Sequence, residues 1–182
     1  MRLLDGEGNG PWAGVDSNHR LKVISVQETV DRNVNRIDHK VWSLPFEGID
    51  PVGADDYFVY IRNTGTKDLA VTDVRVESTV AGVVEVHHVS GTAVHTAGVD
   101  ISPVNRYLGG SATPTATIKT DTDVTGLTNE GVIFWINCPV VDTLYHLSTS
   151  SNIIIAPGQA MALMWDTATG ILSGVVSLVE LP

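Results

Sequence analysis

The sequence contains a single cysteine, Cys138, among its 182 residues. No internal disulfide is therefore possible, and the core must be held by packing alone. No apolar run approaches the ~20 residues that a transmembrane helix needs, and the first residues lack the apolar segment of a secretory signal. We therefore expect a chain that is soluble as synthesised in the cytoplasm, needs no secretion and has no membrane partner.

Basic residues are also scarce, because 11 Lys and Arg stand against 21 Asp and Glu, a formal net charge of -10. An acidic chain repels phosphate backbones, so nucleic acid is not an expected partner. Six of the basic residues lie in residues 1–40, whereas residues 121–182 contain none. Any attraction to an acidic partner must therefore come from the first part of the chain.

Charged residues of both signs make up only 18% of the chain, below the ~25% of an ordinary globular protein. A surface this poor in charge fits a subunit that covers part of itself with other subunits. We therefore expect a homo-oligomer.

The motifs of common enzyme classes are missing. There is no Gly-x-Ser-x-Gly, Walker or Gly-x-Gly-x-x-Gly pattern, and Cys138 stands before Pro139 at the end of an apolar run without the surroundings of a reactive thiol. Paired carboxylates in a cleft, as glycosidases need, are not indicated either. We therefore predict no catalytic residue and no cofactor.

Candidate metal ligands are poorly placed. His87 and His88 are adjacent in an expected strand and would point to opposite faces, so one should face the core or a subunit contact and the other solvent. The alternative, a metal site of the cupin type, lacks its His-x-His and Glu spacing. The pairs Asp55–Asp56 and Asp121–Asp123 do not match a calcium loop and are interpreted as turn caps. We predict no metal site.

Residues that favour strands are abundant: 26 Val, 12 Ile and 18 Thr. No stretch keeps the apolar spacing of a long helix. Apolar and polar residues alternate instead in short segments separated by Gly, Pro, Asn and Asp. The expected strands are residues 19–27, 39–46, 56–64, 69–78, 82–90, 113–120, 131–138, two around Pro157–Gly158 within 152–167, and 170–181.

Two details of this pattern carry further expectations. Residues 56–64 and 69–78 are joined by a short Asn/Gly turn, so we expect them to pair as a hairpin. Residues 131–138 are almost entirely apolar, which predicts a strand covered on both faces or lying at a subunit contact. Residues 91–112 have no sustained pattern and predict a long loop or a pair of short edge strands.

About nine strands with short connections predict an all-β fold, an antiparallel two-sheet sandwich of the jelly-roll type. An immunoglobulin-like sandwich is the main alternative, but its Cys…Trp…Cys spacing is absent. Residues 1–18, rich in Gly, Asn and Asp, predict an irregular N-terminal arm, and residues 19–182 a single sandwich domain.

The first 46 residues combine cations with aromatic side chains, which suits docking onto an acidic surface. Trp135 and Trp165, by contrast, fall in expected core strands. The alternative is that residues 19–46 only supply two sandwich strands and that 1–18 alone is free. The predicted partner-binding residues are Trp12, Arg20, Lys22, Arg32, Arg36, Lys40, Trp42 and Phe46.

Three stretches give the chain a resemblance to a known group. They are VDSNHRLKVISVQET (15–29), FVYIRNTGTKDLAVTDVRV (58–76) and IIIAPGQAMALMWDTATGILSGVVSLVEL (153–181). In their pattern of strands and turns they resemble the small jelly-roll structural proteins of tailed bacteriophage virions.

This resemblance implies a virion protein that decorates and cements the capsid. Its expected partners are the major capsid protein and further copies of itself, as a homotrimer, on a particle assembled in the host cytoplasm. The alternative role within the same group is a tail or head-fibre module that binds a receptor or glycan.

Overall fold

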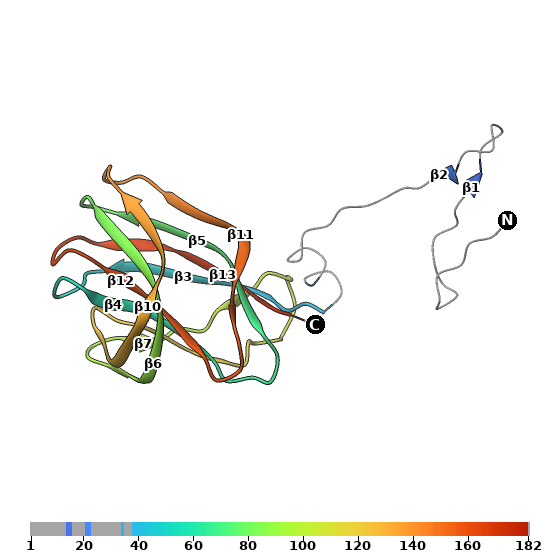
Figure 1. Cartoon of the computed structure of the whole chain (residues 1–182), viewed down its shortest axis with the longest axis horizontal. Coiled ribbons are helices and arrows are strands. Elements are labelled where there is room, and N and C mark those ends of the chain that lie inside the picture. The colour runs from blue at the N-terminus through green and yellow to red at the C-terminus, as the bar shows by residue number, and fades with distance from the viewer. Residues whose placement is uncertain (1–13, 16–20, 23–33, 35–37, 182) are drawn as a thin grey trace.

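The computed structural model describes residues 14–15, 21–22, 34 and 38–181, and residues 38–181 form a sandwich of two antiparallel sheets (Figure 1). The predicted all-β two-sheet fold is therefore confirmed. The strands are β1 (Gly14–Val15), β2 (Leu21–Lys22), β3 (Val41–Ile49), β4 (Asp56–Asn63), β5 (Leu69–Ser78), β6 (Gly82–His95), β7 (Val99–Asp100), β8 (Val104–Asn105), β9 (Ala116–Thr120), β10 (Val124–Cys138), β11 (Tyr145–Ile155), β12 (Ala160–Trp165) and β13 (Leu172–Glu180).

The strand order is that of a jelly roll. The six-stranded sheet runs β10-β6-β12-β4-β9-β7 and the five-stranded sheet β11-β5-β13-β3-β8. The chain alternates between the sheets through β3, β4, β5 and β6 and returns through β10, β11, β12 and β13. Each of these last four strands pairs with one of the first four in reverse order: β10 with β6, β11 with β5, β12 with β4 and β13 with β3. This folded-back hairpin of eight strands is the jelly-roll topology.

The predicted hairpin between residues 56–64 and 69–78 is wrong. The strands exist at those positions, but β4 pairs with β12 and β9, whereas β5 pairs with β11 and β13 in the other sheet. The turn between them is a corner that crosses the sandwich. The buried Asn63 side chain holds it by donating to the carbonyls of Lys67 and Ile155, both at 2.7 Å, and by accepting from the Gly65 N–H. These bonds satisfy a buried amide that would otherwise be costly.

The core lies between the sheets and is built from the inward positions of the alternating strands. Along β5, Val74 and Val76 are buried, while Asp73, Arg75 and Glu77 face outward. The largest side chains enclosed in this way include Trp42, Trp165, Phe58, Leu44 and Leu163.

Other sequence expectations hold with altered boundaries. The apolar strand predicted at 131–138 begins earlier, at Val124, and the patternless stretch 91–112 contains two short strands, β7 and β8, each outermost in its sheet. Of the strand expected at 19–27, the structure describes Leu21–Lys22, which pairs with β1 and belongs to neither sheet of the sandwich. The predicted domain boundary between residues 18 and 19 lies outside the described residues.

Candidate functional site

The most unusual surface of the sandwich is apolar and lies along its β10 side. β10 is the outermost strand of the six-stranded sheet, β11 is outermost in the five-stranded sheet, and the loop 139–144 joins them. Large apolar side chains project from this strand and loop with between 36% and 62% of their surface exposed. We call this surface the apolar edge, and its residues are Val132, Ile133, Phe134, Trp135, Val140, Val141 and Leu144.

The register of β10 explains why these side chains are exposed. Phe134 pairs with Val86 and faces the core side, yet it remains partly open because no strand lies beyond β10. Ile133 falls in a register shift between Val132 and Phe134, so the side chains of the apolar run do not alternate regularly between the solvent-exposed face and the buried face of the sheet. An outermost strand that is apolar on both faces is a template for association with another chain.

Trp135 is held in place although most of it is exposed. It pairs with Glu85 on β6, and its indole N–H donates to Glu85 Oε1 at 3.2 Å. The other oxygen, Oε2, lies 2.9 Å from Nε2 of the buried His87. Tyr57 packs edge-on against the His87 ring at a centroid distance of 5.5 Å. A tryptophan with a fixed orientation loses little freedom on contact, which is typical of an interface anchor.

The apolar edge is also poor in charge. Residues 131–141 contain no Asp, Glu, Lys or Arg, and the 139–144 loop carries a single acid, Asp142, in a chain whose net charge is -10. Two copies of such an acidic protein repel one another across most of their surfaces. Contact between copies is least opposed where both surfaces carry little charge, which is the case at this edge.

The residues predicted to bind a partner are not brought together. Lys40 pairs with Glu180, while Trp12, Arg20, Arg32, Arg36 and the side chain of Lys22 lie outside what the structure describes. Trp42 and Phe46 belong to the core: the Trp42 indole N–H donates to Ala112 O at 2.8 Å, and Phe46 packs edge-on against Phe58. Partner contact by these two is therefore corrected to a packing role, because β3 is an interior strand of its sheet.

The structure bears on two of the histidines and two of the aspartates singled out in the sequence. His87 is buried and His88 exposed, as expected for neighbours in a strand. Asp56 accepts from the Gly53 N–H at 2.6 Å, and Asp121 caps the turn at 96–98. Within the described ranges, no group of three or more His, Cys, Asp or Glu side chains is placed to hold a metal ion. Nor does the described part of the chain contain a helix long and apolar enough to cross a membrane.

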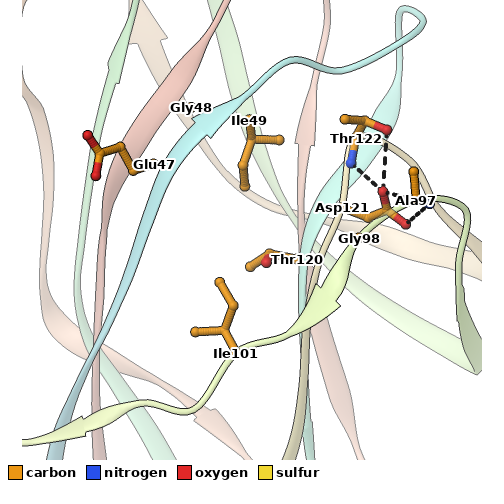
Figure 2. Close-up of a pocket in the computed structure, with 9 residues that line it drawn as sticks. All are labelled: Glu47, Gly48, Ile49, Ala97, Gly98, Ile101, Thr120, Asp121 and Thr122. Carbon is orange, nitrogen blue, oxygen red and sulfur yellow. Dashed lines mark hydrogen bonds between the residues drawn. The ribbon is translucent and has the colours of Figure 1, made fainter.

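A small pocket opens between β3 and the loop before β7 (Figure 2). Its volume is about 260 Å³, below the ~300 Å³ at which ligand sites usually begin. Its lining contains no aromatic side chain on which a sugar ring could stack. The lining residues are Glu47, Gly48, Ile49, Ala97, Gly98, Ile101, Thr120, Asp121 and Thr122.

The acid of this pocket is already engaged. Asp121 is buried, and its carboxylate accepts from the backbone N–H of Ala97 at 3.0 Å and of Thr122 at 2.7 Å, as Figure 2 shows. Burial alone would raise the pKa of Asp121, but hydrogen bonds from the N–H groups of residues 97, 98, 96 and 122 outweigh it and lower the pKa to about 2. The Asp121 carboxylate therefore stabilises the turn at residues 96–98.

This geometry predicts a pH dependence of stability. A lowering of the Asp121 pKa from 3.8 to about 2 corresponds to about 2 kcal/mol of folding free energy. Because the folded-state pKa is the lower one, this contribution is complete above pH 4 and is lost as pH falls from about 4 to about 2. Urea unfolding of Asp121→Asn should therefore show a deficit of about 2 kcal/mol at pH 7 that shrinks toward pH 2. Asp50→Asn, at an exposed position directly after β3, is the control and should show none. An equal deficit of Asp121→Asn at both pH values would contradict the assignment.

Cys138 is enclosed where β10 ends. Its thiol is buried, and burial followed by the nearby Asp166 carboxylate raises the pKa of Cys138 to about 11. The reactive form of a thiol is the thiolate. The only cysteine of the chain therefore serves as a small apolar core residue.

No family model, curated protein or solved structure matches this chain. The functional conclusion therefore rests on the fold and the apolar edge.

Sequence reasoning placed the apolar run correctly but missed its key residue. Trp135 was expected in the core and is the most exposed side chain of the run. The unbroken apolar run at 131–138 was the available signal, since one of its two interpretations was a subunit contact. Nothing in the sequence marked Val140, Val141 and Leu144 as part of this surface, because single apolar residues are common in loops.

Proposed function

We propose that this chain is a structural subunit of a tailed-bacteriophage particle, which decorates the capsid and cements neighbouring capsomers as a homo-oligomer, with a trimer as the expected form. The observation that carries the proposal is the apolar edge. A jelly roll that leaves a fixed Trp135 and the apolar run 132–135 exposed needs a second surface to cover them.

A closed ring of three copies satisfies this need. In a three-fold assembly each subunit places its apolar edge against its neighbour, and closure leaves no such edge exposed. An open chain of copies would leave one uncovered at its end.

Attachment to the capsid is assigned to the first part of the chain. Five of the eleven basic residues, Arg2, Arg20, Lys22, Arg32 and Arg36, fall within the first 36 residues of the chain, where cations are most frequent. Cations concentrated in this part of the chain suit docking onto an acidic capsid surface, where charge pairs fix the register. With Trp42 and Phe46 assigned to the core, Trp12 is the aromatic residue left for this contact.

The test is to remove residues 1–18 and measure binding to purified particles that lack the protein. The shortened chain is expected to keep the oligomeric mass of the full chain and to bind the particles more weakly. Equal binding by the two chains would exclude residues 1–18 and assign the contact to the chain from residue 19 onward.

The number of copies per particle separates this role from its alternative. A cement protein is expected in numbers comparable to the major capsid protein, whereas a tail or head-fibre module is present at a small fraction of that number. Quantitative gel analysis of purified particles measures the ratio, and a small fraction would replace the cement role with the fibre role.

A further inference from the structure

A groove of about 400 Å³ follows the side of β9 that faces away from β4, next to the end of β7. β9 pairs with β4 over its whole length, but it pairs with β7 only at Lys119 and Thr120. On that side, therefore, no strand of the described part of the chain pairs with the first three residues of β9. The groove is lined by Asp100, Ile101, Ser102, Pro103, Thr113, Pro114, Ala116, Thr117 and Ile118.

The ladder between β9 and β4 shows which backbone groups of β9 face this groove. The Thr64 N–H donates to the Thr115 carbonyl at 3.0 Å. This bond lies beside the Asn63–Ala116 pair, which is therefore a pair without mutual hydrogen bonds. Because such pairs alternate with hydrogen-bonded pairs, Ala116 and Ile118 direct their N–H and C=O groups away from β4. The groove side of β9 thus offers main-chain groups to one more strand, and strand addition is a common mode of peptide recognition.

The lining of the groove suits an extended segment that is apolar and uncharged. Asp100 is the only charged residue of the lining. Its carboxylate accepts from Lys119 Nζ at 3.1 Å and lies 2.8 Å from His95 Nε2, so it is already paired. Ile101 packs at the margin of the main core beside the buried Ile118. Apolar side chains of an added strand would cover this margin, and a charged segment would find no free partner there.

We propose that residues 23–27 of a neighbouring copy add a strand to β9 in this groove. The segment reads Val-Ile-Ser-Val-Gln, without Asp, Glu, Lys or Arg, and it directly follows β2. The sequence predicts a strand over residues 19–27, yet β2 pairs with β1 and belongs to neither sheet of the sandwich. Residues 23–27 themselves lie outside the described residues. The proposal rests on the homo-oligomer of the proposed function and names a contact that joins its copies.

The place where the chain joins the sandwich favours a neighbouring copy over the same chain as the donor. Val34 packs against Val41, Ala70 and Val179, on the outer face of the five-stranded sheet, whereas β9 belongs to the other sheet. Residues 28–33 alone separate Val34 from the segment, and six fully extended residues span about 20 Å. Within one chain they would have to pass round the edge of two sheets packed about 10 Å apart, with no slack.

Exchange between copies also agrees with a closed assembly. Each copy gives one strand and receives one, so the contact is heterologous and closes as a ring of three. The contact lies on the β7 and β8 side of the sandwich, away from the apolar edge on β10 and the 139–144 loop. The two contacts can therefore be tested independently of one another.

The test is chemical crosslinking of the full chain carrying Ser25→Cys and Thr117→Cys with a short bis-maleimide. On a denaturing gel, bands are expected at two and three times 19.5 kDa. Each single variant should give the single-chain band alone, since the native Cys138, present in all variants, is buried. The matched control combines Ser25→Cys with Thr169→Cys, exposed in the turn between β12 and β13, and should also give the single-chain band.

A third substitution, Ala116→Pro, tests the main-chain contact itself. It removes the N–H that faces the groove and leaves the ladder to β4 intact, because proline is tolerated at the first residue of a strand. Added to the crosslinking variant, it should weaken the strand contact about fivefold and lower the yield of crosslinked chains at a fixed short reaction time. Ala116→Ser keeps this N–H and should leave the yield unchanged.

Three results would overturn the proposal. They are the absence of crosslinked multimers, crosslinks confined to a single chain, which would place the segment on its own sandwich, and equal multimer yields from the Thr169→Cys control. Light scattering of the wild type separates this failure from that of the proposed function. An oligomer without these crosslinks leaves the structural role standing, whereas a mass of 19.5 kDa removes the oligomer and the strand exchange together.

Discussion

Replacing Trp165 with alanine is expected to lower the free energy of unfolding by about 3–5 kcal/mol, a large part of the 5–15 kcal/mol that a domain usually has. The Trp165 side chain is fully buried between the sheets, and its indole N–H donates to the carbonyl of Thr169 at 2.9 Å. Its ring is packed so closely against the backbone that a Cβ on Gly82 would lie 2.6 Å from the ring. The truncation therefore opens a cavity and removes a partly buried hydrogen bond.

Urea unfolding followed by circular dichroism, at one subunit concentration, measures this loss. Trp165→Phe keeps most of the apolar contact and should lose less than half as much. Leu108→Ala, at a position 92% exposed, is the surface control and should stay within about 0.5 kcal/mol of the wild type. An unchanged urea midpoint for Trp165→Ala would show that the residue does not support the core as described.

Replacing both Phe134 and Trp135 with glutamate is expected to convert the oligomer to monomers. The wild-type chain should have a mass near three times 19.5 kDa, and the variant a mass near 19.5 kDa. Each glutamate would be buried without a partner in the subunit contact, at a cost of several kcal/mol per charge, and would face the same acid on a neighbour. Trp135 is 62% exposed in the single chain, whereas Phe134 is 37% exposed and faces the core side, so circular dichroism must show that the variant keeps the sandwich fold.

Light scattering at micromolar concentration measures the mass directly. The matched control replaces two exposed apolar residues, Val104 on β8 and Leu108 shortly after it, with glutamate and adds the same charge away from the apolar edge. This control should keep the oligomeric mass. Dissociation of the control as well would point to overall charge repulsion, and a wild-type mass of 19.5 kDa would remove the oligomer from the proposal.

The strands themselves were predictable because alternation is a local property. β5 matches its predicted range from Leu69 to Ser78, because the alternation of apolar and polar residues there can be recognised without knowing which strands are its neighbours. The assignment of strands to sheets was not local. The turn after Asn63 has the composition of a hairpin, yet the partners of β4 and β5 include β12 and β13, about 100 residues further along the chain.

The candidate site shows the same limit through two tryptophans. Trp42 and Trp135 both lie in apolar strands, and the sequence placed Trp42 at a partner surface and Trp135 in the core. In the structure Trp42 is buried and Trp135 is exposed, because β3 lies between β13 and β8 while β10 has a neighbour on one side alone. Exposure here is decided by the position of a strand in its sheet, which depends on the order of all the strands together.

The place of β13 also determines how the polypeptide acquires its structure during synthesis. β13 lies between β5 and β3 and pairs with both. These two strands therefore lack their common hydrogen-bonding partner until residues 172–180 have left the ribosome. Until then both present unpaired, apolar strand edges, and the sheet closes only through contacts about a hundred residues apart. Folding that waits for such distant contacts is slow and exposes the nascent chain to aggregation. We therefore expect the yield of soluble protein to depend on chaperones and on low expression temperature, and a chain that stops before residue 172 to accumulate as aggregates.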